Sequence, residues 1–155
     1  MINNQDIVFL KKSITLSNNS PDPRTKIGAI LINCGGLIIG EGYNHYINGV
    51  VPDKNKKKIL HAERAAIYDA IKKHNHIINS TLYCYWVGCI ECCLSIAGVG
   101  IKRVVTHKIS LDKNTKWLDS IELGHEILHE SGIQFDVYDG VLKERIFKGG
   151  EYRWI

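Results

Sequence analysis

The segments His61-Ala62-Glu63 and Cys89-Ile90-Glu91-Cys92 decide how this sequence is interpreted. The two cysteines have the spacing that lets both thiolates bind one metal ion, and the histidine supplies a third ligand. A structural zinc site usually has four protein ligands, whereas a catalytic site has three and leaves the fourth position to water. The glutamate lies two residues beyond the histidine and can act on that water instead of the metal. The pattern predicts a catalytic zinc site with His61, Cys89 and Cys92 as ligands and Glu63 as the acid–base group.

The length and composition indicate one packed domain, residues 1–155. With 155 residues and 45% apolar content, the chain can bury most of the apolar surface that it exposes when unfolded. No apolar run approaches the roughly eighteen residues of a membrane span, and the start, MINNQDIVFLKK, does not resemble a signal peptide. Five cysteines, an odd number, argue against a disulfide framework and fit a reducing compartment. We therefore expect a cytoplasmic protein without membrane contact.

The formal charge of +4 is compatible with a small anionic substrate. It is far from the dense basic face of a duplex-binding protein, so a nucleic-acid partner is not expected. The charge is concentrated at Lys54–Lys58, just before the histidine ligand. This segment is interpreted either as a solvated loop or as an active-site rim that attracts phosphate.

Apolar periodicity and turn residues predict alternating elements along the chain. A helix is expected after Asn3 and Asn4, ending near Asn18, and a hairpin is expected from strands 27–32 and 37–39 with a turn at 33–36. The later elements are a helix beginning close to residue 61, a strand at 82–87, a helix at 89–97, a strand at 103–106, a helix at 117–130 and a last strand at 134–138. This order predicts a mixed sheet with helices packed on its faces.

Four segments in order, beyond the metal motif alone, resemble one known family. They are Asp22-Pro23-Arg24-Thr25-Lys26-Ile27-Gly28-Ala29, Gly42-Tyr43-Asn44, His61-Ala62-Glu63, and Cys89-Ile90-Glu91-Cys92 continued by Gly100-Ile101-Lys102-Arg103-Val104. The chain resembles the deoxycytidylate (dCMP) deaminases of the cytidine deaminase superfamily over about residues 22–132, with a C-terminal tail at 140–155.

The resemblance implies a cytidine deaminase-like α/β fold, a three-layer α/β/α sandwich with a five-stranded mixed sheet, and a homo-oligomer. It implies Zn²⁺ as cofactor and a nucleotide as the small-molecule substrate. It also implies that Asn44 contacts the sugar, that Ile27 packs on the base and that the amide of Ala62 binds near the pyrimidine carbonyl. Lys26 is a candidate for holding a phosphate. The sequence departs from the family pattern at Gly88, which replaces a proline before the first metal cysteine, and at Ala65 and Ile47.

The expected activity is zinc-dependent hydrolysis of dCMP to dUMP and ammonia, an enzyme of nucleotide metabolism. A nucleoside or free-base deaminase would have the same catalytic residues without a phosphate site. A tRNA adenosine deaminase shares the histidine-alanine-glutamate motif, the zinc and the chain length. A non-catalytic zinc-binding module is a third alternative, although such a module has no use for Glu63. Outside the metal motif, six histidines are expected to be solvated: His45, His74, His76, His107, His125 and His129.

Overall fold

The computed structural model describes residues 1–53, 58–111 and 118–155. Five strands form the central sheet in the order β2-β1-β3-β4-β5. Their bounds are β1 Gly28–Ile32, β2 Ile38–Tyr43, β3 Thr81–Cys84, β4 Arg103–His107 and β5 Gln134–Tyr138. β1 is antiparallel to β2 and β3, whereas β3, β4 and β5 are mutually parallel. The sheet is mixed because a short turn joins the hairpin while helical crossovers join the parallel strands.

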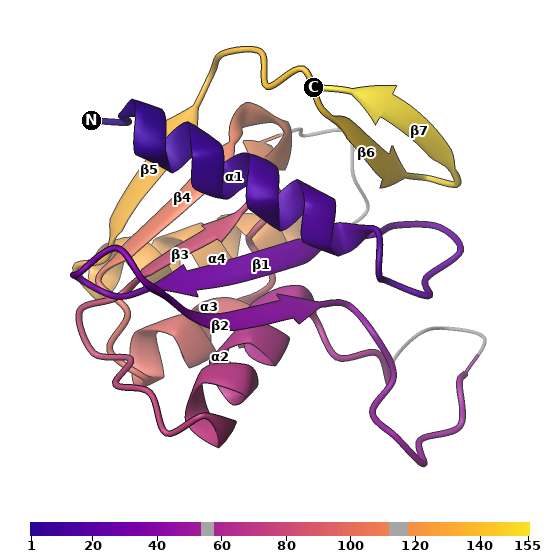
Figure 1. Cartoon of the computed structure of the whole chain (residues 1–155), viewed down its shortest axis with the longest axis horizontal. Helices are drawn as coiled ribbons and strands as arrows, with labels where there is room; N and C mark the ends of the chain where they lie inside the picture. Colours follow the sequence, from indigo (N-terminus) through magenta and orange to yellow (C-terminus); the bar gives the residue numbers. More distant parts are fainter. Residues whose placement is uncertain (54–57, 112–117) are drawn as a thin grey trace.

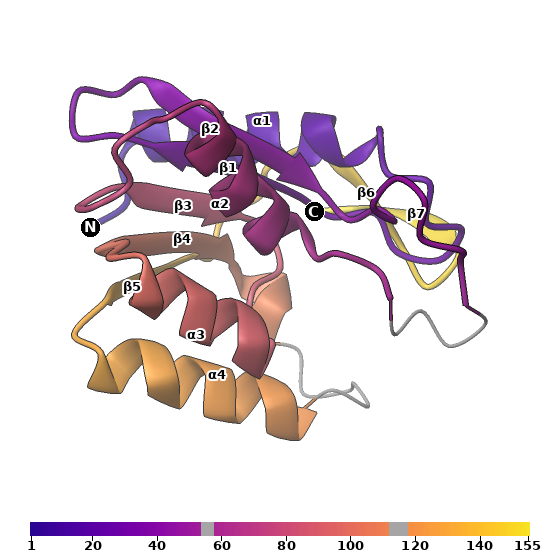
Figure 2. The same ribbon diagram turned by 90° about the horizontal axis from the view of Figure 1, so that it is seen from below.

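Helices cover both faces of this sheet, as Figures 1 and 2 show. Their bounds are α1 Asn4–Ser17, α2 Ala62–Lys72, α3 Ile90–Gly98 and α4 Leu118–Glu130, with a short 3₁₀ helix, η1, at Lys108–Leu111. α1 lies on one face, and α2, α3 and α4 lie on the other. The expected three-layer α/β/α sandwich with a five-stranded mixed sheet is confirmed.

Strand alternation divides the core into two apolar clusters. On β1, Ala29 and Leu31 belong to the cluster under α2 and α3, and Ile30 and Ile32 belong to the cluster under α1. All five residues of β1 are buried, as expected for a strand covered on both faces. This strand begins beside the loops that carry the candidate site, because Gly28 pairs with Tyr43 at the end of β2 and Ala29 pairs with Cys84 at the end of β3.

α1 is fixed to the sheet by an ionic network around Asp6. The Asp6 carboxylate accepts hydrogen bonds from Arg103, at 2.7 and 3.0 Å, and from the Tyr83 hydroxyl at 2.7 Å. It also closes a capping box with Asn3, which explains why the helix begins at the predicted position. Burial opposes ionisation, but these donors together lower the pKa of Asp6 below its ordinary value.

The predicted strand at 82–87 is wrong in its extent, because β3 ends at Cys84. β1 and β4 continue to pair with β3 only as far as Cys84 and Tyr83. Beyond that point the chain leaves the sheet, and the buried Tyr85 donates its hydroxyl to the carbonyl of Lys26 at 2.7 Å. The residues from 85 to 88 form a loop that leads into α3.

The expectation that 134–138 is the last strand is also wrong. The tail forms an antiparallel hairpin of β6, Arg145–Lys148, and β7, Glu151–Trp154. Gly149 and Gly150 make its turn with φ values of +70° and +89°, a backbone conformation that favours glycine. The hairpin packs against the α1 side of the molecule through the buried Ile146.

Across the described parts of the chain, none of the helices is both long and apolar enough to cross a membrane.

Candidate metal centre and active site

The N-terminus of α2 positions His61, Ala62 and Glu63. His61 is the N-cap and makes no side-chain capping bond, so its ring is available to another partner. The helix start lies tightly against β2, because a Cβ at Gly42 would collide with the backbone of Ala62 and Ala66. This close approach fixes the three-residue motif at the edge of the sheet.

The N-terminus of α3 positions the two cysteines. Cys89 is the N-cap, and its sulfur accepts a hydrogen bond from the backbone N–H of Cys92 at 3.3 Å. The Cys92 thiol lies beside it, and this contact together with the His61 ring lowers the pKa of Cys89 well below its ordinary value. Unpaired amides at a helix start favour a thiolate in the same way.

Gly88 allows the loop to reach this helix start. Its φ of +154° is outside the range of proline, which explains how the chain accommodates the departure from the family residue. A Cβ at Gly124 of α4 would collide with the Gly88 carbonyl, so the two backbones meet at this point. α4 therefore packs against the loop at 85–88, which leads to the ligand Cys89.

The three predicted ligands converge. Nδ1 of His61 lies 3.3 Å from Sγ of Cys89 and 3.4 Å from Sγ of Cys92, and the three atoms all lie within 4.8 Å of one another. Tetrahedral coordination with Zn–S of about 2.3 Å and Zn–N of about 2.0–2.1 Å separates nitrogen from sulfur by about 3.5 Å. The donor set and its spacing therefore fit one zinc ion.

Glu63 lies at the same centre but outside the donor group. Its side chain is 4% exposed, and the carboxyl group lies near His61, Cys89 and Cys92. Burial raises the pKa of Glu63, because a charged carboxylate loses its hydration there. A carboxyl group with a raised pKa can both accept and donate a proton near neutrality.

Arg64 is a site residue that the sequence analysis missed. One guanidinium nitrogen lies 3.2 Å from a carboxylate oxygen of Glu91. Burial opposes its charge, but Cys92, Glu91 and Cys89 together raise the pKa of Arg64. A fixed positive charge beside the thiolates reduces their electron donation to a metal. The signal for Arg64 in the sequence was its position directly after Glu63 and three residues, about one helical turn, after the ligand His61.

Asn44 and Ile27, both expected at the substrate, are joined by a hydrogen bond. Oδ1 of Asn44 accepts from the backbone N–H of Ile27 at 2.8 Å, and Nδ2 donates to the carbonyl of Thr25 at 2.8 Å. The buried Asn44 therefore holds the loop before β1 in place. The sugar contact expected of Asn44 and the base contact expected of Ile27 stay predictions.

The lysines expected near the phosphate are only partly described. Nζ of Lys26 lies 3.4 Å from the carbonyl of Asn18 and 5.9 Å from the ring of Phe147. Most of the Lys54–Lys58 segment lies outside the described residues. The roles of these lysines stay predictions as well.

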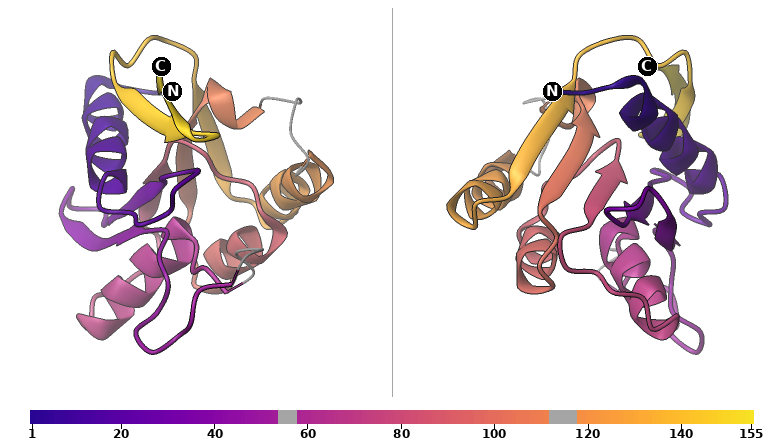
Figure 3. Two further views of the ribbon diagram at one scale, coloured as in Figure 1. Left: turned by 90° about the vertical axis from the view of Figure 1, so that its right-hand side faces the viewer. Right: turned by 60° about the vertical axis from the view of Figure 1, so that its left-hand side comes forward.

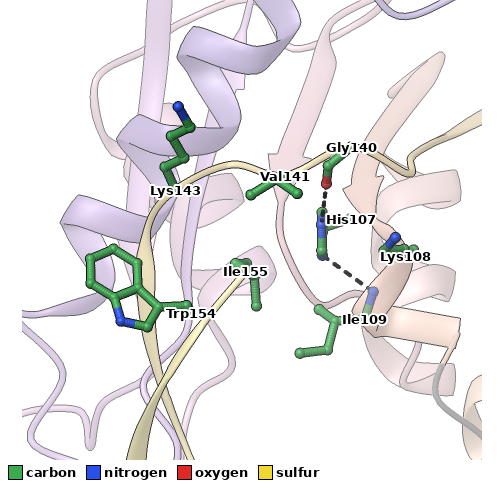
Figure 4. Close-up of a pocket in the computed structure, with 8 residues that line it drawn as sticks. All are labelled: His107, Lys108, Ile109, Gly140, Val141, Lys143, Trp154 and Ile155. Carbon is green, nitrogen blue, oxygen red and sulfur yellow. Dashed lines mark hydrogen bonds between the residues drawn. The ribbon is translucent and has the colours of Figure 1, made fainter.

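One surface groove lies away from the metal ligands. It has a volume of about 870 Å³ and is lined by His107, Lys108, Ile109, Gly140, Val141, Lys143, Trp154 and Ile155 (Figure 4). His107 is not solvated as expected: it is 3% exposed and bonds to the carbonyl of Gly140 at 3.1 Å. Its Nδ1 accepts from the Ile109 N–H, so Nε2 carries the proton. His107 joins the end of β4 to the loop before β6.

The candidate centre lies within a matched family region. Residues 3–108 match a family model described as the cytidine and deoxycytidylate deaminase zinc-binding region. A deoxycytidylate deaminase of Pongo abelii is 30% identical over 110 residues, which cover 63% of this chain and 61% of the relative. The chain therefore matches less than two thirds of that relative's length.

Two solved structures share the fold. The dCMP deaminase of cyanophage S-TIM5 in its apo form has a TM-score of 0.71 at 24% identity, covering 89% of this chain and all of the other. The same enzyme in complex with dCMP and dUMP has a TM-score of 0.70 at 23% identity, with 89% and 99% coverage. At these identities the likeness establishes the architecture.

Proposed function

We propose, from the premise that this chain belongs to the cytidine and deoxycytidylate deaminase zinc-binding family, that it is a hydrolase that converts dCMP and water to dUMP and ammonia. The observation that carries the proposal is a buried carboxyl group, Glu63, beside three donors spaced for one zinc ion. A purely structural zinc site needs no such carboxyl group. The named relatives, which are deoxycytidylate deaminases, support the same substrate.

Zinc bound by His61, Cys89 and Cys92 would supply the activated water that attacks C4 of the cytosine ring. Glu63 carries the protons: one to N3 of the ring, which makes C4 electrophilic, and a later one to the departing amino group. Its burial supports this role, because a desolvated carboxyl group holds a proton more readily. We further propose that the amide of Ala62, in the first turn of α2, binds the pyrimidine carbonyl.

The same chemistry would suit a nucleoside, a free base or an adenosine in tRNA, so selection depends on groups away from the ring. We propose that Asn44 and Ile27 form one side of the substrate site. The side-chain oxygen of Asn44 accepts a hydrogen bond from the backbone N–H of Ile27, which fixes the two residues relative to each other. The two cysteine ligands are suited to a reducing compartment, and we place the enzyme in the cytoplasm. The homo-oligomer expected from the family stays a prediction.

Side-by-side assays of ammonia release test the substrate. The zinc-loaded protein should use dCMP at least about 100-fold more efficiently than deoxycytidine in kcat/KM, because two charge-assisted phosphate contacts contribute about 1.5–3 kcal/mol each. The ratio should shrink as salt rises. Equal efficiency on dCMP and deoxycytidine would favour the nucleoside enzyme, and turnover of guanine or of tRNA adenosine alone would reject a cytosine substrate.

A further inference from the structure

The C-terminal hairpin is paired with the segment that precedes β1. The backbone N–H of Lys26 donates to the carbonyl of Phe147 at 2.9 Å, and Thr25 faces Lys148 in an antiparallel bridge. The next residue along the chain is Ile27, whose amide is held by Asn44. The hairpin therefore borders the proposed substrate site through its main chain.

This pairing determines which side chains share a face. Residues directly opposite each other project to the same side, so Lys148 shares one face with Thr25, and Phe147 shares the other with Lys26. Side chains alternate along β6, so Lys148 also lies on the face of Ile146, which is 0% exposed. Lys148 therefore lies on the inward face of the hairpin.

The ammonium group of Lys148 is positioned by Trp86. Its Nζ lies 3.8 Å from the centroid of the tryptophan ring, and both side chains are half-buried. A cation over the face of a tryptophan is attracted by the ring, and tryptophan is the strongest aromatic partner for this contact. Trp86 belongs to the loop between β3 and α3, three residues before the ligand Cys89. The ammonium is thus held beside the loop that carries the metal ligands.

Lys26 has a different orientation, although it lies at the same junction. Its Nζ is near the carbonyl of Asn18, at the end of α1, and near the ring of Phe147. Of these two lysines, Lys148 contacts the loop at 85–88 through its ammonium, whereas Lys26 contacts it through its backbone carbonyl, which accepts from Tyr85. Figures 1 and 3 show the hairpin on the same side of the sheet as α1.

We propose that Lys148 binds the 5′-phosphate of the nucleotide, with Trp86 holding its ammonium in position; this inference rests on the proposed function. The ring must reach the buried centre at Glu63, and we place the phosphate at the outer rim of the site, beside the loops at 24–27 and 85–88, which the hydrogen bond from Tyr85 to the Lys26 carbonyl joins. An ammonium has three N–H donors, and a bond to a phosphate oxygen is charge-assisted. The hairpin would therefore decide whether the enzyme prefers a nucleotide to a nucleoside.

Lys148→Gln tests this inference in the zinc-loaded full chain. We expect kcat/KM for dCMP and the calorimetric affinity for dUMP to fall about 10- to 100-fold, the effect of one charge-assisted contact. Deoxycytidine turnover and deoxyuridine binding should change by less than about twofold, because these ligands lack the phosphate. Lys148→Arg should recover most of the preference, since it keeps the charge.

Arg145→Gln is the matched control. It removes one charge from the same hairpin, but the guanidinium of Arg145 stacks on Tyr152, 4.5 Å from its ring, and not on Trp86. Its dCMP preference should equal that of the wild type. Lys26→Gln tests whether Lys26, the other lysine at this junction, binds the phosphate instead of Lys148.

The inference is overturned if Lys148→Gln leaves dCMP and dUMP unaffected, or if it weakens nucleotide and nucleoside equally, as the loss of a purely structural contact would. A nucleotide-specific loss in Lys26→Gln alone would also overturn it. In each of these cases turnover of deoxycytidine leaves the proposed deaminase function intact. Failure of the wild-type protein to deaminate any cytosine compound would instead reject the proposed function, and the inference with it.

Discussion

Glu63→Gln should lower kcat for dCMP by at least about 10⁴-fold while zinc remains bound, because one carboxyl group serves several proton transfers. Glutamine has nearly the same shape and fits the buried position, but it cannot carry the proton to N3 or to the leaving amine. The three metal donors are unchanged, so zinc content should stay near one per chain. Steady-state kinetics and metal analysis of the same preparation measure both quantities.

Glu91→Gln is the control for this substitution. Glu91 lies between the two cysteine ligands, but its side chain is 73% exposed and pairs with Arg64. An exposed ion pair contributes little, so kcat should stay within about threefold of the wild type. A Glu63→Gln protein with activity within about tenfold of wild type would remove Glu63 from the mechanism.

Cys89→Ser should abolish tight zinc binding and, with it, turnover. Serine is a good N-cap, so the substitution preserves the start of α3 while it removes a thiolate ligand. Any loss of stability therefore reflects the loss of zinc binding more than the loss of the helix cap, because binding energy at such a site is also folding energy. Thermal unfolding with and without added zinc should show a rise in Tm for the wild type and almost none for the variant.

Cys34→Ser provides the same chemical change at an exposed cysteine. It should retain about one zinc per chain, the wild-type Tm and full turnover. A Cys89→Ser protein that keeps its zinc and its activity would show that the donor group is not the metal site.

The architecture and the convergence of the metal ligands could be predicted because their signals are local. The capping residue Asn3 and the apolar positions after it determine where α1 begins, and the same periodicity defines the other helices. His61 and Cys89 each stand at the start of a helix, where the sequence patterns change from extended to helical. Two helix starts at one edge of a sheet bring such residues together.

The features that were missed depend on contacts between distant residues. The buried His107 ring donates a hydrogen bond to the carbonyl of Gly140, and neither residue indicates the other in the sequence. The hairpin of β6 and β7 had local signals that the sequence analysis did not use, in the turn residues Gly149-Gly150 and in the alternation of charged and aromatic residues along Glu151–Trp154, although β7 is exposed throughout. Its attachment to Thr25 through Lys148 involves residues more than one hundred positions apart.

The most direct test of the account follows ammonia release from dCMP while zinc is restored to metal-free protein. The account predicts no turnover without zinc and a rate that rises in proportion to bound metal up to about one zinc per chain, as a site with three protein ligands and an open position requires. A protein that binds one zinc and releases no ammonia from dCMP, or one whose turnover does not depend on zinc, would contradict it.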